Sequence, residues 1–103
     1  MNIKFDFIEI NNPYKLLYSM LPNQGCLEFQ RDSPFKEHKW HTHSNDETLL
    51  ILEGEMEVYY EEGSKICSAG DIIYLPSMKK HGSKALSNGA VYAIATEFID
   101  FNV

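Results

Sequence analysis

The sequence contains few cysteines, few basic residues and no long apolar run. Its 103 residues include two cysteines, Cys26 and Cys67, which are too far apart to form a close-spaced metal-binding pair. We expect both to be buried small hydrophobic side chains in a reducing, cytoplasmic environment. Lys and Arg number 9 against 15 Asp and Glu, and this net charge of −6 argues against nucleic acid or an anionic membrane as a partner. No apolar run approaches the roughly 20 residues of a membrane span, and no secretory leader pattern opens the chain, so we expect a soluble protein.

Turn residues and short apolar runs alternate over most of the chain. No repeat or Pro/Gly/Ser-rich linker divides the sequence, which predicts one domain over residues 1–103. Over residues 25–98, short runs rich in Ile, Val, Tyr and Phe are separated by turn residues at regular intervals, a pattern typical of an all-β sandwich or barrel. Residues 1–24 form a predicted N-terminal arm. In this arm "IKFDFIEI" alternates like a strand that covers an edge or pairs with a neighbour, and "PYKLLYSML" is the one plausible helix, with Pro13 in its first turn.

The stretch "HKWHTHSNDETLLILEG" carries a candidate metal site. On a strand, His41 and His43 point to the same face with roughly 6–7 Å between their backbone positions, so both imidazoles can reach one ion. Glu47 has the same parity but would lie about 13 Å beyond His43 on an unbroken strand. The carboxylate can therefore join the histidines only if the chain bends at residues 44–46, which are turn-forming types.

A helical alternative exists for the same stretch, because Ser44 and Glu47 also fit the capping-box pattern at the start of a helix. The residues that follow favour a strand: "TLLILEG" is short, lacks helical periodicity and ends at Gly54. Both faces of this strand are apolar, with Leu49 and Ile51 on the side of Glu47 and Leu50 and Leu52 on the other. We expect a turn at Glu53-Gly54 and a hairpin with the alternating run "EMEVYY".

Two spaced motifs resemble those of the cupin family. The first is His, one residue, His, three residues, Glu, six residues, Gly, and it corresponds to His41, His43, Glu47 and Gly54. The second is "GDIIYLPSMKKH", with Gly70, Pro76 and His81 at the family's spacing. Three positions depart from the family pattern: Phe35 and Met78 replace glycines, and Ala85 replaces an asparagine.

The resemblance implies a small jelly-roll β-barrel, with its core at about residues 25–98, that holds one metal ion. The implied ligands are His41, His43, Glu47 and His81. Imidazoles with one carboxylate suit a divalent Fe, Mn, Ni, Cu or Zn ion and disfavour Ca²⁺. Glu47 is also a candidate catalytic base if it detaches from the ion.

Other polar and aromatic side chains are less strongly indicated as functional. The odd spacing of His38 from His41 predicts a surface residue, and we expect Trp40 to pack against another sheet or subunit. Tyr74 and Tyr92 could line the cavity, but strand parity does not decide which way either points. Glu28 and Gln30 share a face, which is either part of a pocket or, as we favour, a solvated strand face.

Function is less constrained than fold. Cupins with three histidines and one glutamate resemble dioxygenases acting on small polar or anionic molecules, which we favour. The alternatives are a metal-dependent isomerase or lyase, a non-catalytic small-molecule-binding or sensing protein, and a metal-stabilised structural protein. The two apolar faces of "TLLIL" also suggest a homodimer, unless the same chain covers the second face.

Overall fold

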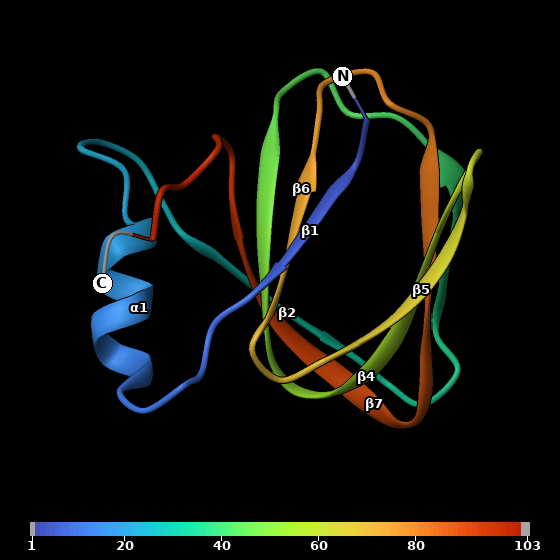
Figure 1. The fold of residues 1–103 in the computed structure, drawn as a ribbon, viewed down its shortest axis with the longest axis horizontal. Helices are drawn as coiled ribbons and strands as arrows, with labels where there is room; N and C mark the ends of the chain where they lie inside the picture. The colour runs from blue at the N-terminus through green and yellow to red at the C-terminus, as the bar shows by residue number, and fades with distance from the viewer. Residues whose placement is uncertain (1, 102–103) are drawn as a thin grey trace.

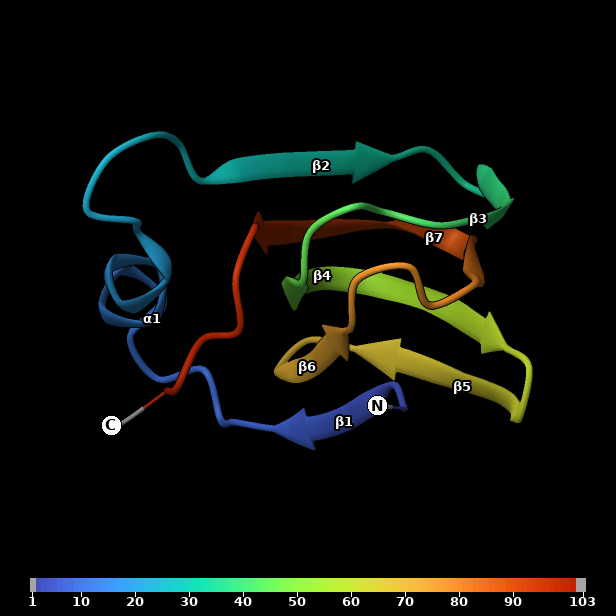
Figure 2. The same cartoon turned by 90° about the horizontal axis from the view of Figure 1, so that it is seen from above.

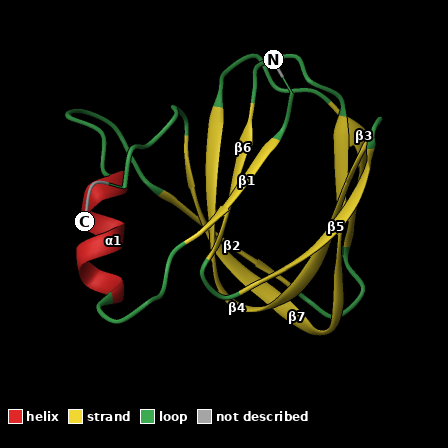
Figure 3. Ribbon diagram, in the orientation of Figure 1, coloured by secondary structure: helices red, strands yellow, loops and turns green. Residues whose placement is uncertain are grey.

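Antiparallel strands dominate the computed structural model, which describes residues 2–101 (Figures 1 and 3). The elements are β1 (Lys4–Phe7), α1 (Pro13–Met20), β2 (Glu28–Asp32), β3 (Glu37–His41), β4 (Glu47–Tyr60), β5 (Gly63–Ser68), β6 (Asp71–Leu75) and β7 (His81–Ala95). The strand order is β1-β6-β4-β7-β2, with β3 also paired to β7 and β5 also paired to β4. Figure 2 shows β1 and β2 at opposite edges of this arrangement. The all-β fold predicted from the sequence is confirmed.

The predicted hairpin at Glu53-Gly54 is wrong, because β4 runs through this point as one long strand. Gly54 has a φ of 73°, and the β4–β7 register shifts beside it. A Cβ added to Gly54 would lie 2.0 Å from the carbonyl oxygen of Gly89, which itself has a φ of 71° in β7. The glycine therefore permits a bend and a close crossing of two strands rather than a turn. The hairpin lies after Tyr60 instead, where β4 pairs with β5.

The apolar side chains of β4 point alternately into the barrel and out of it, as strand parity predicts. Leu49 and Ile51 lie in the cluster inside the barrel, whereas Leu50 and Leu52 belong to a second cluster on its outer face. The other buried members of the inner cluster are Ile3, Met56, Val58, Cys67, Ile73, Leu75, Ala85, Ala90 and Tyr92. Part of the inner cluster also lines the cavity described below: Leu49, Met56, Val58, Ile73, Leu75 and Tyr92.

The helix α1 covers the outer cluster (Figure 1). It begins with Pro13 in its first turn, and the side chain of Asn12 accepts a hydrogen bond from the Lys15 N–H, so the predicted helix is confirmed. Leu16 and Met20 of α1 are buried in the outer cluster. Because the second apolar face is covered by the same chain, it no longer argues for a homodimer. No helix within residues 2–101 is long and apolar enough to cross a membrane.

The N-terminal strand and the two cysteines lie in different environments. The strand β1 pairs antiparallel with β6 of its own chain, with Phe5 opposite Ile73, so this part of the arm extends the sheet. Cys67 is buried, as predicted. Cys26 is exposed, so its predicted burial is wrong, because it lies in the loop between α1 and β2 outside both apolar clusters.

Candidate metal centre

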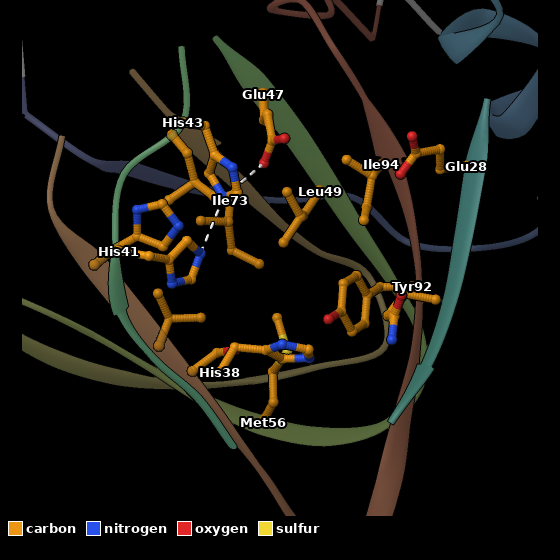
Figure 4. A pocket seen from close by; sticks show the side chains of 15 residues that line it. Glu28, His38, His41, His43, Glu47, Leu49, Met56, Ile73, Tyr92 and Ile94 are labelled. Atoms are coloured by element: carbon orange, nitrogen blue, oxygen red, sulfur yellow. Dashed lines mark hydrogen bonds and ion pairs between the residues drawn. The ribbon is translucent and has the colours of Figure 1, made fainter. Parts of the chain in front are cut away.

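Three of the four predicted metal ligands converge in the structure (Figure 4). His41 ends β3, His43 lies in the following loop, and His81 begins β7. One nitrogen from each ring lies within 4.8 Å of the other two. The separations between ring centroids are 4.7 Å for His41–His43, 4.5 Å for His41–His81 and 5.1 Å for His43–His81. Residues distant in sequence thus place three donor atoms around one point.

Backbone carbonyls set the orientation of two of these rings. Nδ1 of His81 lies 2.9 Å from the Lys79 carbonyl oxygen, and Nδ1 of His41 contacts the Lys39 carbonyl in the same way. A carbonyl only accepts, so each Nδ1 carries the proton and each Nε2 presents a lone pair. Nε2 of His41 lies 3.0 Å from Nε2 of His43. One nitrogen from each of the three rings lies close enough to the others to share one cation, so the donor set fits a metal ion.

The protonation of the rings is also suited to metal binding. Burial lowers the pKa of His81, and nearby His41 and His43 lower it further, although its hydrogen bond to the Lys79 carbonyl opposes this. Burial and the neighbouring His41 likewise lower the pKa of His43. Both rings therefore stay neutral to more acidic pH than an exposed histidine, and a neutral ring is the form that binds metal.

Glu47 lies beside this centre without joining the three-histidine cluster. The chain bends at Ser44 and Asn45, as the sequence required, and no helix follows. The bend places Oε1 of Glu47 3.5 Å from Nε2 of His43. Burial raises the pKa of Glu47, and the carboxylate of Glu28 adds to the effect. A cation at the histidines would counter this rise, since an opposite charge favours the ionised carboxylate.

The loops that carry the ligands are hydrogen-bonded to each other. The Met78 N–H donates to the His43 carbonyl at 2.7 Å, and the Ser77 N–H donates to Oδ1 of Asp46 at 2.8 Å. Met78 has a φ of 61° and Phe35 a φ of 65°, and these are the two non-glycine residues with positive φ in the described chain. Both stand where the family motifs have glycine, so the left-handed conformation is kept without the residue that favours it.

A cavity of about 200 Å³ adjoins the three histidines inside the barrel. Its lining combines the four predicted ligands with apolar residues and a second polar group (Figure 4). The remaining lining residues are Glu28, Gln30, His38, Leu49, Met56, Val58, Ile73, Leu75, Ser83, Tyr92 and Ile94. The cavity therefore has a histidine-lined wall, apolar walls and polar side chains that the sequence analysis did not assign to it.

The prediction that His38 is a surface residue is wrong. The side chain is half-buried and lines the cavity, because the β3–β7 register shifts between His38 and His41 and the irregularity breaks strict alternation. The prediction of a solvated face holds for Glu28, which is exposed, but not for Gln30, which is half-buried; both side chains line the cavity. These errors share a cause: strand parity cannot reveal a bulge or the inner side of a closing barrel.

The aromatic residues divide between the two sides of the barrel. Tyr92 lines the cavity, whereas the Tyr74 hydroxyl donates to the Ile99 carbonyl at 3.1 Å in the outer cluster. Trp40 is about half exposed, and its ring lies 4.9 Å from that of Tyr59, measured between centroids. Trp40 thus packs against another strand of its own chain and does not line the cavity.

Sequence reasoning missed Asp32, a buried carboxylate that accepts three hydrogen bonds. Gln30 Nε2 lies 2.9 Å and His38 Nε2 3.0 Å from Oδ1, and the Tyr92 hydroxyl lies 2.8 Å from Oδ2. Burial alone would raise the pKa of Asp32, but these hydrogen bonds more than offset it and hold the pKa below its usual value. The position of Asp32 at a strand end, before a turn, gave no signal of this role.

Comparison with known proteins identifies the family. Residues 29–97 match the model of the cupin domain. The chain belongs to the cupin family. Among solved structures, the cupin is similar to a protein of unknown function from Rhizobium leguminosarum, with a TM-score of 0.65 and 22% identity over 69% of this chain and 67% of that one. It is also similar to a DUF861 family protein from Thermotoga maritima, with a TM-score of 0.64 and 20% identity over 92% and 99% of the two chains.

A third similar structure is KdgF from Halomonas sp., with a TM-score of 0.57 and 18% identity over 72% of the cupin and 82% of KdgF. No curated protein sequence matches the cupin. At these identities the structural matches support the fold, and the function has to be argued from the site itself.

Proposed function

We propose that this cupin is a mononuclear metalloenzyme that oxidises a small polar or anionic molecule with O₂. The observation that supports it is the convergence of three imidazole nitrogens at the wall of an internal cavity. In the proposal, His41, His43, His81 and Glu47 hold one divalent Fe, Mn, Ni, Cu or Zn ion. Such an ion would supply Lewis acidity and a template for substrate at coordination positions that the protein leaves open.

The charge of the site favours an anionic substrate. Three neutral imidazoles and one carboxylate leave a divalent ion with net positive charge, which attracts an enolate, phenolate or carboxylate. Glu47 is proposed to act also as a base, because burial already raises its affinity for a proton. Leu49, Met56 and Ile73 provide apolar walls. The cavity is smaller than the roughly 300–1,000 Å³ typical of drug-sized ligands, so the substrate should be small.

The first prediction concerns metal content. The wild-type protein, purified without a polyhistidine tag, should carry about one transition-metal ion per chain, and the double variant His41→Ala/His43→Ala should carry almost none. Mass spectrometry of the metal content measures both, and circular dichroism checks that the variant folds. The control is Trp40→Ala, which changes an exposed side chain on β3, the strand that also carries His41; this variant should keep its metal. Equal metal in wild type and the double variant would refute the ligand assignment.

Reaction class can be tested by loading the protein separately with Fe²⁺, Mn²⁺, Ni²⁺, Cu²⁺ and Zn²⁺. O₂ consumption and substrate loss are then followed over small enols, catechols, thiols and organic acids. Oxidation requires loss of both O₂ and substrate. Turnover that needs metal but no O₂ would indicate an isomerase or lyase, and tight binding without turnover under every metal would indicate a binding or sensing protein.

A homodimer is also part of the proposal. It is supported by an exposed apolar groove between α1 and β2 instead of the second face of β4. Tyr14 and Tyr18 of α1 and Phe29 of the edge strand β2 are more than half exposed and line one apolar groove with Leu17, Leu21 and Leu27. Covering this groove would bury apolar area. Light scattering should give twice the chain mass of 11.9 kDa, and Phe29→Glu should shift the mass toward the monomer. A monomer mass for the wild type at high micromolar concentration would argue against it.

A cytoplasmic location is proposed as well. It is supported by the two cysteines, which are both free in the structure. Fractionation of cells that produce the native protein would test this location.

A further inference from the structure

The cavity contains a second polar cluster that includes none of the proposed metal ligands. At its centre, the carboxylate of Asp32 is 2% exposed and holds His38, Gln30 and Tyr92 by the three hydrogen bonds described above. His38, Gln30 and Tyr92 line the same cavity as the metal centre, and Figure 4 labels His38 and Tyr92. A ligand in this cavity is therefore exposed to both groups of side chains.

The hydrogen bonds define which nitrogen of His38 can react. The Asp32 carboxylate can only accept, so Nε2 of His38 carries a proton, and in the neutral ring the lone pair lies on Nδ1. The hydrogen bond of the His38 side chain within residues 2–101 uses Nε2. Outside the exposed residues of this range, no fully buried side-chain nitrogen or oxygen lacks a partner, so Nδ1 is at least partly open, as expected of a side chain that lines the cavity. Its lone pair is available for a proton.

We infer that His38 is a second general base in the cavity, besides the role proposed for Glu47, and that Asp32 is its positioning residue. His38 accepts the proton of an enol, phenol or catechol hydroxyl bound beside the metal centre. The O–H bond breaks, its electron pair stays on oxygen, and the proton forms a new bond to Nδ1. This inference rests on the proposed function and assigns its substrate class as molecules with an acidic hydroxyl.

The surroundings of His38 suit this role. Asp32 on β2 stabilises the imidazolium that forms and remains ionised. Tyr92 on β7 keeps its proton, because burial and the Asp32 carboxylate raise its pKa, so it serves as a donor to Asp32. On the backbone side, the Tyr59 hydroxyl of β4 lies 3.4 Å from the His38 carbonyl and 2.7 Å from Oε2 of Glu37. The side chain of His38 is thus held by Asp32 and its backbone carbonyl by Tyr59.

The test uses the Zn²⁺-loaded protein and 4-nitrocatechol, whose absorption spectrum separates its singly and doubly ionised forms. Zn²⁺ is redox-inactive, so only binding and proton transfer are observed. Wild type should bind the doubly ionised probe at neutral pH. In His38→Gln, whose amide can still donate to Asp32, that form should appear only about one pH unit higher or more, with at least a tenfold weaker affinity at neutral pH. Lys84→Gln, an exposed residue on β7 opposite Glu37, should behave as wild type.

The outcomes separate this inference from the proposed function. Zn²⁺-dependent binding that is identical in wild type and His38→Gln would overturn the role of His38 and leave the metal site intact. Absence of Zn²⁺-dependent binding in wild type would overturn both. Nitrogen NMR of the Zn²⁺-loaded protein adds a readout that needs no probe: neutral His38 should carry its proton on Nε2, and Asp32→Asn should change this tautomer. A proton on Nδ1 in wild type would also overturn the inference.

Discussion

Met78 illustrates how a single residue can carry strain beside the site. Its left-handed backbone costs a residue with a Cβ roughly 1–2 kcal/mol, yet its N–H donates to the carbonyl of His43. The hydrogen bond thus holds a ligand-bearing loop in a conformation that methionine disfavours. Strain of this kind persists only where the surrounding structure enforces it.

Met78→Asn should therefore stabilise the protein by about 0.5–1 kcal/mol, because asparagine tolerates this conformation and lacks the chain entropy of glycine. Little burial is lost, since Met78 is 66% exposed. Urea unfolding monitored by circular dichroism measures the change. Met78→Leu is the matched control and should have no such effect, because leucine has the same conformational cost. Equal stability of the two variants would contradict the prediction.

Among the elements, β4 and β7 determine the shape of the barrel because they bend together. Gly54 lets β4 approach β7 more closely than a Cβ would allow, and Gly89 does the same for β7 and the carbonyl oxygen of Asp32 at the end of β2. Both strands also contribute to the site, since β4 begins at Glu47 and β7 at His81. The geometry of the bend thus influences where the ligands lie.

Gly54→Ala should destabilise the protein by more than about 3 kcal/mol, because the new methyl group would lie 2.0 Å from the Gly89 carbonyl oxygen and the φ of 73° is unfavourable for alanine. Gly63→Ala is the milder comparison, since no atom lies within 4 Å of the added Cβ. Thermal and urea unfolding of both variants measure the difference. A loss at Gly54 no larger than at Gly63 would show that β4 and β7 can separate at the bend.

The elements also show where sequence reasoning succeeds. Alternation placed Leu49 inside and Leu50 outside the barrel correctly, because the two-residue period of a strand holds wherever the strand is regular. Alternation failed for His38, because an irregularity in β3 changes the parity of the strand. The turn predicted at Gly54 was wrong because glycine is favoured both in a turn and in a bend. The motif spacing correctly predicted that His41, His43 and His81 lie close together. The role of Asp32 depends on contacts between β2, β3 and β7 that no local pattern encodes.

At the scale of the whole molecule, the lowered pKa values of His43 and His81 link stability to pH. Their pKa values lie below the unfolded value of about 6.5, so the unfolded chain binds more protons between the two values. The stability of the metal-free protein should therefore fall as pH decreases from about 7.5 to about 5.5. Asp32, whose pKa is lowered, titrates below this window, whereas the raised pKa of Glu47 contributes with the opposite sign.

Urea unfolding in the presence of a chelator, repeated across this pH range, measures the effect. The double variant His43→Gln/His81→Gln should show a flatter dependence, because glutamine does not titrate. An identical slope in wild type and variant would contradict the assignment of the pH dependence to these two rings. With metal bound, the dependence should become steeper with the same sign, because protons compete with the ion for the ring nitrogens.

The hydrogen bonds between the two ligand-bearing loops have a consequence for how the protein acquires its ion. Met78 and Ser77 connect these loops through protein contacts alone, and these contacts do not require an ion. A site held in this way would not need an ion to fold, and nitrogen donors generally bind divalent metals with affinities that rise in the order Mn, Fe, Co, Ni, Cu, with Zn below Cu. The ion bound in the cell should therefore reflect the free concentrations of these metals during synthesis, and growth media that differ in trace metals should yield protein with different ions in the same site.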